Sequence, residues 1–583
     1  MIKKFFALAT ILALLAVVFA APAPRADELP ENSFAKFLPE NTLFYMEADD
    51  ISASYERMKE LALYKMITNP EMKLFFDNLA KMAEDEAMGD FVEEDEEGEP
   101  GEEKSFLEKF HAYLDLLNLA ASGKMYMAVT DYVKSENEMH AFMAMDITQE
   151  TKPHMVKFIQ KAIDDIQKMD EEVISFNETI NEVAFTVIGD DEDKKNENLY
   201  IGITDKHAVF AFGKKSAERF LHYTSNPPEK SLHAKADFVD CYKNVASKEM
   251  FFYTDVGKIF QMADVANMAA AGPQPQFMKK FMDSLMNLYK GMGAGVSFQG
   301  RAVVDELYGT LGKVEWESIQ QMGQFPCSFK SASLMPKDAM LYAGFSLPMD
   351  ALYNDIIKYF GEAVQGKITE FENLTMLSMK DEIVKALGNE VGLYAAFSGL
   401  SPNFLAVVEV RDAVVVNQIV SEEGLAALFP GMQFSKSVLN EADVFTLAMP
   451  GGPPMALTVY NDWLMFGTLT AVKDGMLRQE PNSLQVNENF RDSMAYRAGM
   501  ENISSMFFLD TKAAFSALYD NAMPFAQSKL AQNPNFDPAA FPSKDAFVGD
   551  MIPMVFFGEM KNNAFKMRSA GPVPYSVLQI MQH

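Results

Sequence analysis

The chain presents the same series of landmarks twice, in the same order. Three pairs of runs carry the repetition most clearly: LPENTLFY (38–45) with MPKDAMLY (335–342), NEVAFT (181–186) with NEADVFT (440–446), and LYIGITDKHAVFAFG (199–213) with MALTVYNDWLMFGT (455–468). Internal repetition of this kind fixes the architecture of a chain before any detail of its function is known. We therefore expect two related halves, residues 27–330 and 331–571, followed by a C-terminal tail at 572–583.

Short segments rich in Phe, Tyr, Met and Val, bounded by turn residues, predict strands rather than long helices. We expect ten strands in the first half, each with a counterpart in the second: 42–48, 125–130, 141–146, 173–177, 183–188, 199–204, 208–213, 250–255, 293–300 and 305–311. Tight polar turns join several of them, which favours antiparallel neighbours. Helices with one apolar face intervene, so the predicted fold class is α+β, with a mainly antiparallel sheet and packed helices in each half.

The N-terminus has the pattern of a secretory signal. Lys3 and Lys4 precede an apolar run of about 15 residues, shorter than the roughly 20 that span a bilayer, and small residues follow up to Ala26. We expect residues 1–26 to be the signal peptide and cleavage region, and no transmembrane segment in the mature chain. The predicted location is periplasmic or extracellular.

Two cysteines, Cys241 and Cys327, are present. An exported protein meets an oxidising environment, which allows one disulfide between them. The two positions do not correspond between the halves, so such a bond would tie the connecting segment to the first half. Sequence alone leaves the pairing open, because it does not supply the Cα separation.

The formal net charge of −31 limits the choice of partners. An acidic surface repels phosphate backbones, so nucleic acid is not expected as a partner. Part of the charge is local, since residues 83–104 form an acidic segment with Gly and Pro, which predicts a solvated loop. This segment lacks the ligand spacing of a calcium-binding EF-hand loop.

The search for catalytic patterns yields no assignment of catalytic, cofactor-binding or metal-binding residues. Seven His are scattered, with no close metal-binding pair, and His207 corresponds to Trp463 in the other half. The glycine-rich run 291–300 leads into a strand and lacks the Lys-Ser/Thr end of a phosphate loop. No nucleophile-elbow pattern is present.

Methionine is unusually abundant, with 41 residues. Alternation in a strand places both Met of MYM (125–127) on one face, and the same holds for FMAM (142–145). A Met-rich core, a soft-metal site and an apolar groove all fit this composition, because Met fills irregular gaps and thioethers bind Cu(I).

The segment 38–79 resembles the start of a family of secreted bacterial proteins known only as a domain of unknown function. Leu38-Pro39, the aromatic pair Phe44-Tyr45 and Asn69-Pro70 carry the resemblance, and ALGNEVGLYAAF (386–397) is similar to a later motif of that family. The resemblance implies export and a repeated α+β build. It implies no activity, so no functional residue is transferred.

These observations favour an exported, non-enzymatic protein that binds or scaffolds something at the cell envelope. Two alternatives stay open at this point. One is a carrier of an apolar ligand in a cavity lined by Met and Phe, and the other is an envelope hydrolase with a site between the two halves.

Overall fold

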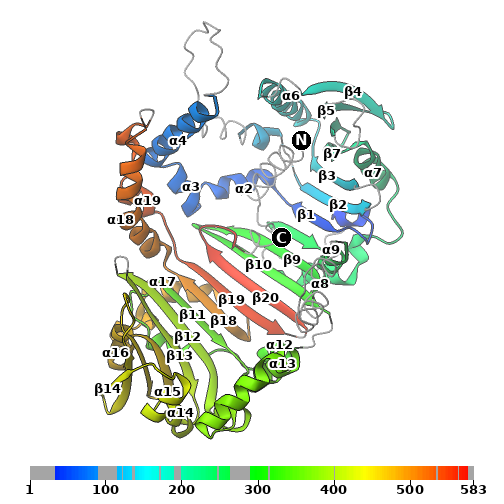
Figure 1. Ribbon diagram of the computed structural model, residues 1–583. Helices are drawn as coiled ribbons and strands as arrows, with labels where there is room; N and C mark the ends of the chain where they lie inside the picture. The colour runs from blue at the N-terminus through cyan, green and yellow to red at the C-terminus, as the bar shows by residue number, and fades with distance from the viewer. Residues whose placement is uncertain are drawn as a thin grey trace.

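A computed structural model of the protein describes residues 33–88, 115–120, 123–133, 138–169, 173–189, 198–245, 249–262, 289–312, 316–398, 401–533, 536–561 and 563–575. Its strands form one 20-stranded sheet in which every pairing is antiparallel (Figure 1). Helices pack on this sheet. The predicted α+β class is therefore confirmed.

The first half contributes ten strands, and each lies within a few residues of a predicted segment. Their order across the sheet is β4–β5–β6–β7–β3–β2–β1–β8–β9–β10. Their bounds are β1 (Phe44–Ala48), β2 (Met125–Val133), β3 (Glu138–Asp146), β4 (Ile174–Ile180), β5 (Val183–Gly189), β6 (Leu199–Ile203), β7 (His207–Phe212), β8 (Met250–Thr254), β9 (Tyr289–Gln299) and β10 (Ala302–Leu311).

The second half also contributes ten strands. Their order is β14–β15–β16–β17–β13–β12–β11–β18–β19–β20, which is the order of the first half with ten added to each number. Their bounds are β11 (Leu341–Ser346), β12 (Leu387–Ser398), β13 (Ser401–Val410), β14 (Phe434–Leu439), β15 (Ala442–Leu447), β16 (Met455–Tyr460), β17 (Trp463–Thr468), β18 (Ile503–Leu509), β19 (Met554–Lys561) and β20 (Ala564–Gly571).

The two halves are joined through their last strands. β10 pairs with β20 over eight residues, from Val303 opposite Gly571 to Thr310 opposite Ala564. This differs from the expectation of a separate sheet in each half. The physical reason is that an unpaired edge strand exposes backbone donors and acceptors, and the two edges satisfy each other's. A common origin of the two halves stays a prediction.

Helices cover both faces of the sheet (Figure 1). In the first half, α2 and α6 lie on one face, while α7 and α8 lie on the other, and α9 contacts β9. Their bounds are α2 (Ile51–Met58), α3 (Ala62–Ile67), α4 (Pro70–Met88), α6 (Lys152–Met169), α7 (Lys214–Ser225), α8 (Ala236–Asn244) and α9 (Val256–Met262).

In the second half, α16 and α17 cover one face, while α14 and α15 pack on the other face near β15 and β16. The bounds of the remaining helices are α12 (Glu317–Met322), α13 (Met349–Thr375), α14 (Ala413–Ile419), α15 (Glu422–Leu428), α16 (Leu469–Leu477), α17 (Glu488–Ser493), α18 (Thr511–Leu530) and α19 (Lys544–Val548).

A second contact between the halves is made by helices. Phe75 on α4 packs against Phe536 and Phe541, with ring centroids 6.3 and 5.9 Å apart. The Glu71 carboxylate accepts a hydrogen bond of 2.7 Å from the backbone amide of Ser543. Figure 1 shows α4 beside α18 and α19, away from the β10–β20 seam. The halves are thus held together at two separate places.

Local sequence explains several element ends. Asp50 caps α2 by accepting a 3.0 Å hydrogen bond from the Ala53 amide, the usual role of Asp at a helix N-terminus. The tight turns at Asn181-Glu182 and Asn440-Glu441 both have positive φ at their two central residues. This left-handed geometry is the type I′ turn that joins antiparallel strands.

Some expectations fall outside the described residues. The predicted signal region at 1–26 lies there. The acidic segment 83–104 is described only as far as Met88, and that part is helical because α4 continues to this residue. In the C-terminal tail 572–583, the Tyr575 ring packs edge-on against Phe556 at 4.3 Å. Among the described residues, no helix combines the length and apolar character needed to cross a lipid bilayer.

Candidate functional site

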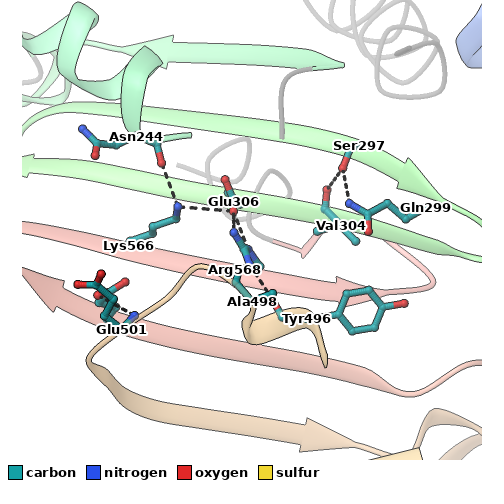
Figure 2. A network of polar contacts seen from close by, with 11 residues as sticks. Asn244, Ser297, Gln299, Val304, Glu306, Tyr496, Ala498, Glu501, Lys566 and Arg568 are labelled. Atoms are coloured by element: carbon teal, nitrogen blue, oxygen red, sulfur yellow. Dashed lines mark hydrogen bonds and ion pairs between the residues drawn. The ribbon is translucent and has the colours of Figure 1, made fainter. Parts of the chain in front are cut away.

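A buried ion pair lies at the seam between the halves (Figure 2). Glu306 on β10 is fully buried, and its Oε1 accepts a 2.6 Å hydrogen bond from Nε of Arg568 on β20. Arg568 also donates to the carbonyl oxygens of Tyr496, at 2.9 Å, and of Ala498. Lys566 Nζ lies 3.6 Å from the same Glu306 oxygen. These contacts tie β10, β20 and the segment around Tyr496 and Ala498 together inside the sheet.

A second polar cluster lies at one end of β1 in the first half. The buried Glu47 carboxylate accepts hydrogen bonds from Tyr45 OH at 2.6 Å, from Ser33 Oγ at 3.0 Å and from Lys124 Nζ at 2.5 Å. Lys124 also pairs with Asp49 at 2.7 Å. Glu47 has its acceptor sites occupied by donors, which is the condition for keeping a carboxylate buried.

On the neighbouring strands, Asp146 and His207 form a pair whose pKa values are shifted from their ordinary ranges. Asp146 at the end of β3 accepts from Tyr126 OH at 3.2 Å, and its other oxygen lies 3.4 Å from His207 Nε2. Burial raises the pKa of Asp146 and lowers the pKa of His207. The His207 ring also packs against Phe34 and Phe220. His207 is therefore a side chain that packs against aromatic rings and pairs with a carboxylate.

The second half does not repeat this polar cluster at the matching positions. Register places Glu390 where Lys124 stands, Glu409 where Asp146 stands and Trp463 where His207 stands. Glu390 accepts hydrogen bonds from Ser328 Oγ, at 2.6 Å, and from the Ser331 amide, at 2.7 Å. Glu47 in the first half and Glu390 in the second are thus both held by structural donors.

One ion pair in the first half is incompletely satisfied. Glu249 is almost fully buried just before β8, with Oε1 3.6 Å from Arg57 Nε on α2. Glu249 Oε2, Arg57 Nε and Arg57 Nη2 are buried and make no hydrogen bond. Burial raises the pKa of Glu249 to about 7, although the nearby Arg57 charge lowers it. The pair therefore lowers the free energy of unfolding, because buried polar atoms without hydrogen-bond partners are unfavourable.

The clearest difference between the halves is how far a row of apolar side chains is covered. One cross-strand row of side chains runs over seven strands of the first half, on the face that α2 and α6 cover. Six of its members belong to the buried core and the seventh, Met127, is partly buried against it. In order from β9 to β6, this first-half row is Ala294, Phe252, Met46, Met127, Met143, Phe210 and Ile201.

The matching second-half row is also entirely apolar, but two of its members are exposed. Leu393 is 36% exposed and Phe466 is 45% exposed, whereas Phe210, the counterpart of Phe466, is only 8% exposed. In order from β19 to β16, this second-half row is Phe556, Phe507, Ala343, Leu393, Ala406, Phe466 and Leu457. Phe404, on the neighbouring row, contacts Phe466 with ring centroids 6.2 Å apart.

We call five apolar residues here the open face: the exposed Leu393 and Phe466 with the half-buried Phe404, Ala406 and Phe507. It is the strongest candidate for a binding site in the described chain, because contiguous exposed apolar surface on a soluble domain marks an interaction surface. In the sequence, MALTVYNDWLMFGT stands out only as a repeat landmark, and nothing in it singles out Phe466. A position-by-position comparison of the halves would have shown small residues, Ala343 and Ala406, opposite Met46 and Met143.

The two cysteines are not joined in this structure. Cys241 and Cys327 are both buried free thiols, and they lie in different hydrophobic cores. The disulfide that the sequence allowed is thus not formed here. The methionines of MYM and FMAM lie together in the first-half core, which is the gap-filling role. Within the described ranges, no three His, Cys, Asp or Glu side chains gather as a metal site requires.

Comparison with known proteins adds little. No family model matches the chain, and a search of curated proteins finds no match. Crystal form I of TP0453 is 10% identical, with a TM-score of 0.20, and the alignment covers 41% of this chain and 77% of that one. Form IV is 9% identical, with a TM-score of 0.22, covering 47% and 79%. Form III is 10% identical, with a TM-score of 0.21, covering 42% and 96%. Similarity at this level carries no argument about fold or function.

Proposed function

We propose that the protein is an exported, non-enzymatic binding protein of the cell envelope, and that the open face is its binding surface. Export rests on the N-terminal signal pattern and on the resemblance to a secreted family. The single observation that carries the binding role is the contrast between Phe210 and Phe466. They occupy matching positions in the two halves, yet one is buried under helices and the other is exposed.

Exposure of this row has a cost that a binding role explains. An apolar row across several strands would normally be covered, since burial contributes about 25 cal/mol per Å² of apolar surface. The first half covers its own row with α2 and α6, while in the second half Leu393 and Phe466 stay in contact with water. A partner that covers them recovers this free energy on binding.

The polar clusters support a role without catalysis. The seam pair of Glu306 and Arg568 is saturated by internal contacts, and so is the Glu47 cluster. A hydrolase site at the junction of the halves would need an acid or base directed toward a substrate. The seam instead buries its charges inside a continuous sheet.

Photo-crosslinking in the native cell tests the proposal without assuming an occupant. Phe466 is replaced by p-benzoylphenylalanine, which keeps an aromatic ring in place, and adducts are analysed by mass spectrometry. Val438, 67% exposed on β14 and outside the open face, is the matched control. We expect a defined adduct at position 466 and none at 438. Equal yields at the two positions, or none at either, would refute a binding role for the open face.

A further inference from the structure

The shape and chemistry of the open face select what can bind there. β12 is paired on both sides, with β11 and β13, and β17 is paired with β13 and β16. The backbone donors and acceptors of these strands are therefore occupied by the sheet, and an incoming polypeptide cannot add as a new strand. It can meet only side chains. Such a segment must satisfy its own backbone, which a helix does and an extended peptide does not.

The first half shows how the same row is covered when cover is present. α6 directs Met155, Phe158, Ile159 and Ile163 into the core that contains the first-half row. These residues have the spacing of one apolar helix face. The natural cover for this kind of row is thus an amphipathic helix lying across the strands.

The second half has no equivalent of α6 at that place in the described chain. The segment between β13 and β14 forms two short helices, α14 and α15, where the first half has the 18-residue α6 between β3 and β4. Residues Val416, Val420 and Leu425 of these helices pack with Leu457 and Leu464, at one end of the second-half row. Leu393 and Phe466 remain exposed.

The dimensions suit one helix. Phe507 on β18 and Phe466 on β17 are four strand spacings apart, which is about 19 Å. Between them lie Ala343, Leu393 and Ala406, where the first half has three Met. An α-helix with its side chains is about 10–12 Å wide. Leu393, at the centre of this stretch, is flanked by the small Ala343 and Ala406, so the distance between the two Phe spans the width of a single helix.

The net charge of this chain determines which charged side chains are favoured on the solvent-facing side of that helix. The chain carries a net charge of −31, so a basic polar face is favoured in anything that approaches it. α6 itself has this character, since its 18 residues include four Lys and two Asp. A helix that resembles α6 in both its apolar stripe and its charge is the expected occupant.

We propose that the open face binds an amphipathic helix of a partner protein, with an apolar stripe at i, i+3, i+4 and i+7 spacing and a basic polar face. This inference rests on the proposed function and names its partner class. This is helix-in-groove recognition. The apolar side chains of the helix supply affinity, and its basic face guides the approach of the partner by electrostatic attraction.

A synthetic peptide of residues 152–169 serves as the probe, because this sequence already covers the matching row in the first half. Fluorescently labelled peptide is titrated with the full-length mature protein and followed by anisotropy. We expect saturable binding that weakens at least ten-fold with Phe466→Asp or Leu393→Asp. Binding to Val438→Asp should equal binding to the wild type. A peptide carrying Phe158→Asp should also bind at least ten-fold more weakly.

Two results would overturn the helix inference. One is absence of binding at 100-fold molar excess of protein over peptide. The other is binding that Phe466→Asp and Leu393→Asp leave unchanged, which would show that the peptide exchanges with α6 in the first half. Both substituted residues are exposed, and thermal unfolding of each variant verifies that it is folded.

The crosslinking experiment separates this inference from the proposed function. An adduct at position 466 with the mass of a lipid, or of a second copy of this chain, would support the binding role and overturn the partner helix. An adduct with a different protein whose crosslinked peptide forms a basic amphipathic helix would support both. Absence of any adduct would remove the proposed function itself.

Discussion

Glu306 and Arg568 lie directly opposite each other where β10 pairs with β20, and each occupies the same position within its own half. Ala302 and Ala564 are the first residues of these two strands, and four residues further on stand Glu306 and Arg568. The pseudo-two-fold axis between the halves therefore passes between these two side chains. Two identical halves would place like residues opposite each other here. A buried Glu–Arg pair exists at this point only because the halves differ.

Reversing one charge at this axis should weaken the whole seam. Arg568→Glu places two buried carboxylates together, and we expect the free energy of unfolding to fall by about 3–5 kcal/mol. The double variant Glu306→Arg/Arg568→Glu should recover part of this loss, because opposite charges face each other again. Recovery is incomplete because the carbonyl oxygens of Tyr496 and Ala498 then lose their donor. Urea unfolding followed by circular dichroism measures these differences.

An exposed pair on the adjacent strand provides the control for the seam. Lys561 pairs with Glu501 at 2.7 Å, and both side chains are more than half exposed. Lys561→Glu should cost less than about 1 kcal/mol, as surface pairs do. If Arg568→Glu cost no more than this control, the seam would not depend on the buried pair.

The matched rows predict unequal effects from the same substitution. Phe210→Ala removes a ring from the first-half core and should destabilise the protein by about 3–5 kcal/mol. Phe466→Ala, at the corresponding but exposed position, should cost at most about 1 kcal/mol, because much of its ring already contacts water. Thermal unfolding of the two variants side by side measures the contrast. Equal losses would show that the second-half row is covered in solution.

Two glycines should respond in opposite directions to Ala. A Cβ on Gly467 would lie 2.2 Å from the backbone oxygen of Phe404, where β13 and β17 pair, so Gly467→Ala must displace one strand and should cost about 1–3 kcal/mol. A Cβ on Gly366, inside α13, meets nothing within 4 Å. Gly366→Ala should therefore stabilise the protein by about 0.5–1 kcal/mol. Stability curves in urea decide both signs, and destabilisation by Gly366→Ala would contradict the open surroundings of this residue.

Thiol chemistry tests the cysteines. Burial raises the pKa of Cys241 well above its ordinary range and raises that of Cys327 to about 12, so neither thiol supplies reactive thiolate in the native state. We expect no reaction of native protein with a thiol reagent and reaction of both thiols in denaturant without reductant. The intact mass of unreduced protein is the check. If neither thiol reacted in denaturant and the intact mass of the protein were two hydrogens lower, the disulfide that the sequence allows would be established instead.

The positions of the strands within each half, and the tight turns that join several of them, follow closely from the sequence, whereas the order of the strands across the sheet was not predicted. Tight turns such as Asn181-Glu182 and Asn440-Glu441 have local causes, because the left-handed backbone they need is set by a few residues. Alternation along β2 places Met125 and Met127 on one face without reference to anything distant. Local periodicity therefore carries this part of the fold.

The pairing of the two halves and the exposure of the open face could not be predicted from local sequence patterns. Whether β10 pairs with β20 depends on two edges far apart in the chain, and no local pattern in Val303–Thr310 identifies its partner. The same apolar alternation appears at Phe210 and Phe466, so sequence periodicity cannot distinguish a covered row from an exposed one. The difference comes from where the intervening helices lie, which tertiary packing decides.

The buried pair of Glu249 and Arg57 predicts how stability depends on pH. In the folded protein burial raises the pKa of Glu249 to about 7, whereas an unfolded chain has the ordinary value of about 4.3. Between these two values the native state holds a proton that the unfolded state has released, so raising the pH favours unfolding. Over this window Glu249 should withdraw up to about 4 kcal/mol of stability, and below about pH 4 the effect is absent. Glu249→Gln cannot ionise, so its advantage over the wild type should grow between pH 5 and pH 8, as measured by urea unfolding at each pH.

Glu60→Gln, at an exposed pair with Lys65, is the control and should show no comparable drift. Parallel stability profiles of wild type and Glu249→Gln would mean that this carboxyl titrates in the folded protein as it does in the unfolded chain.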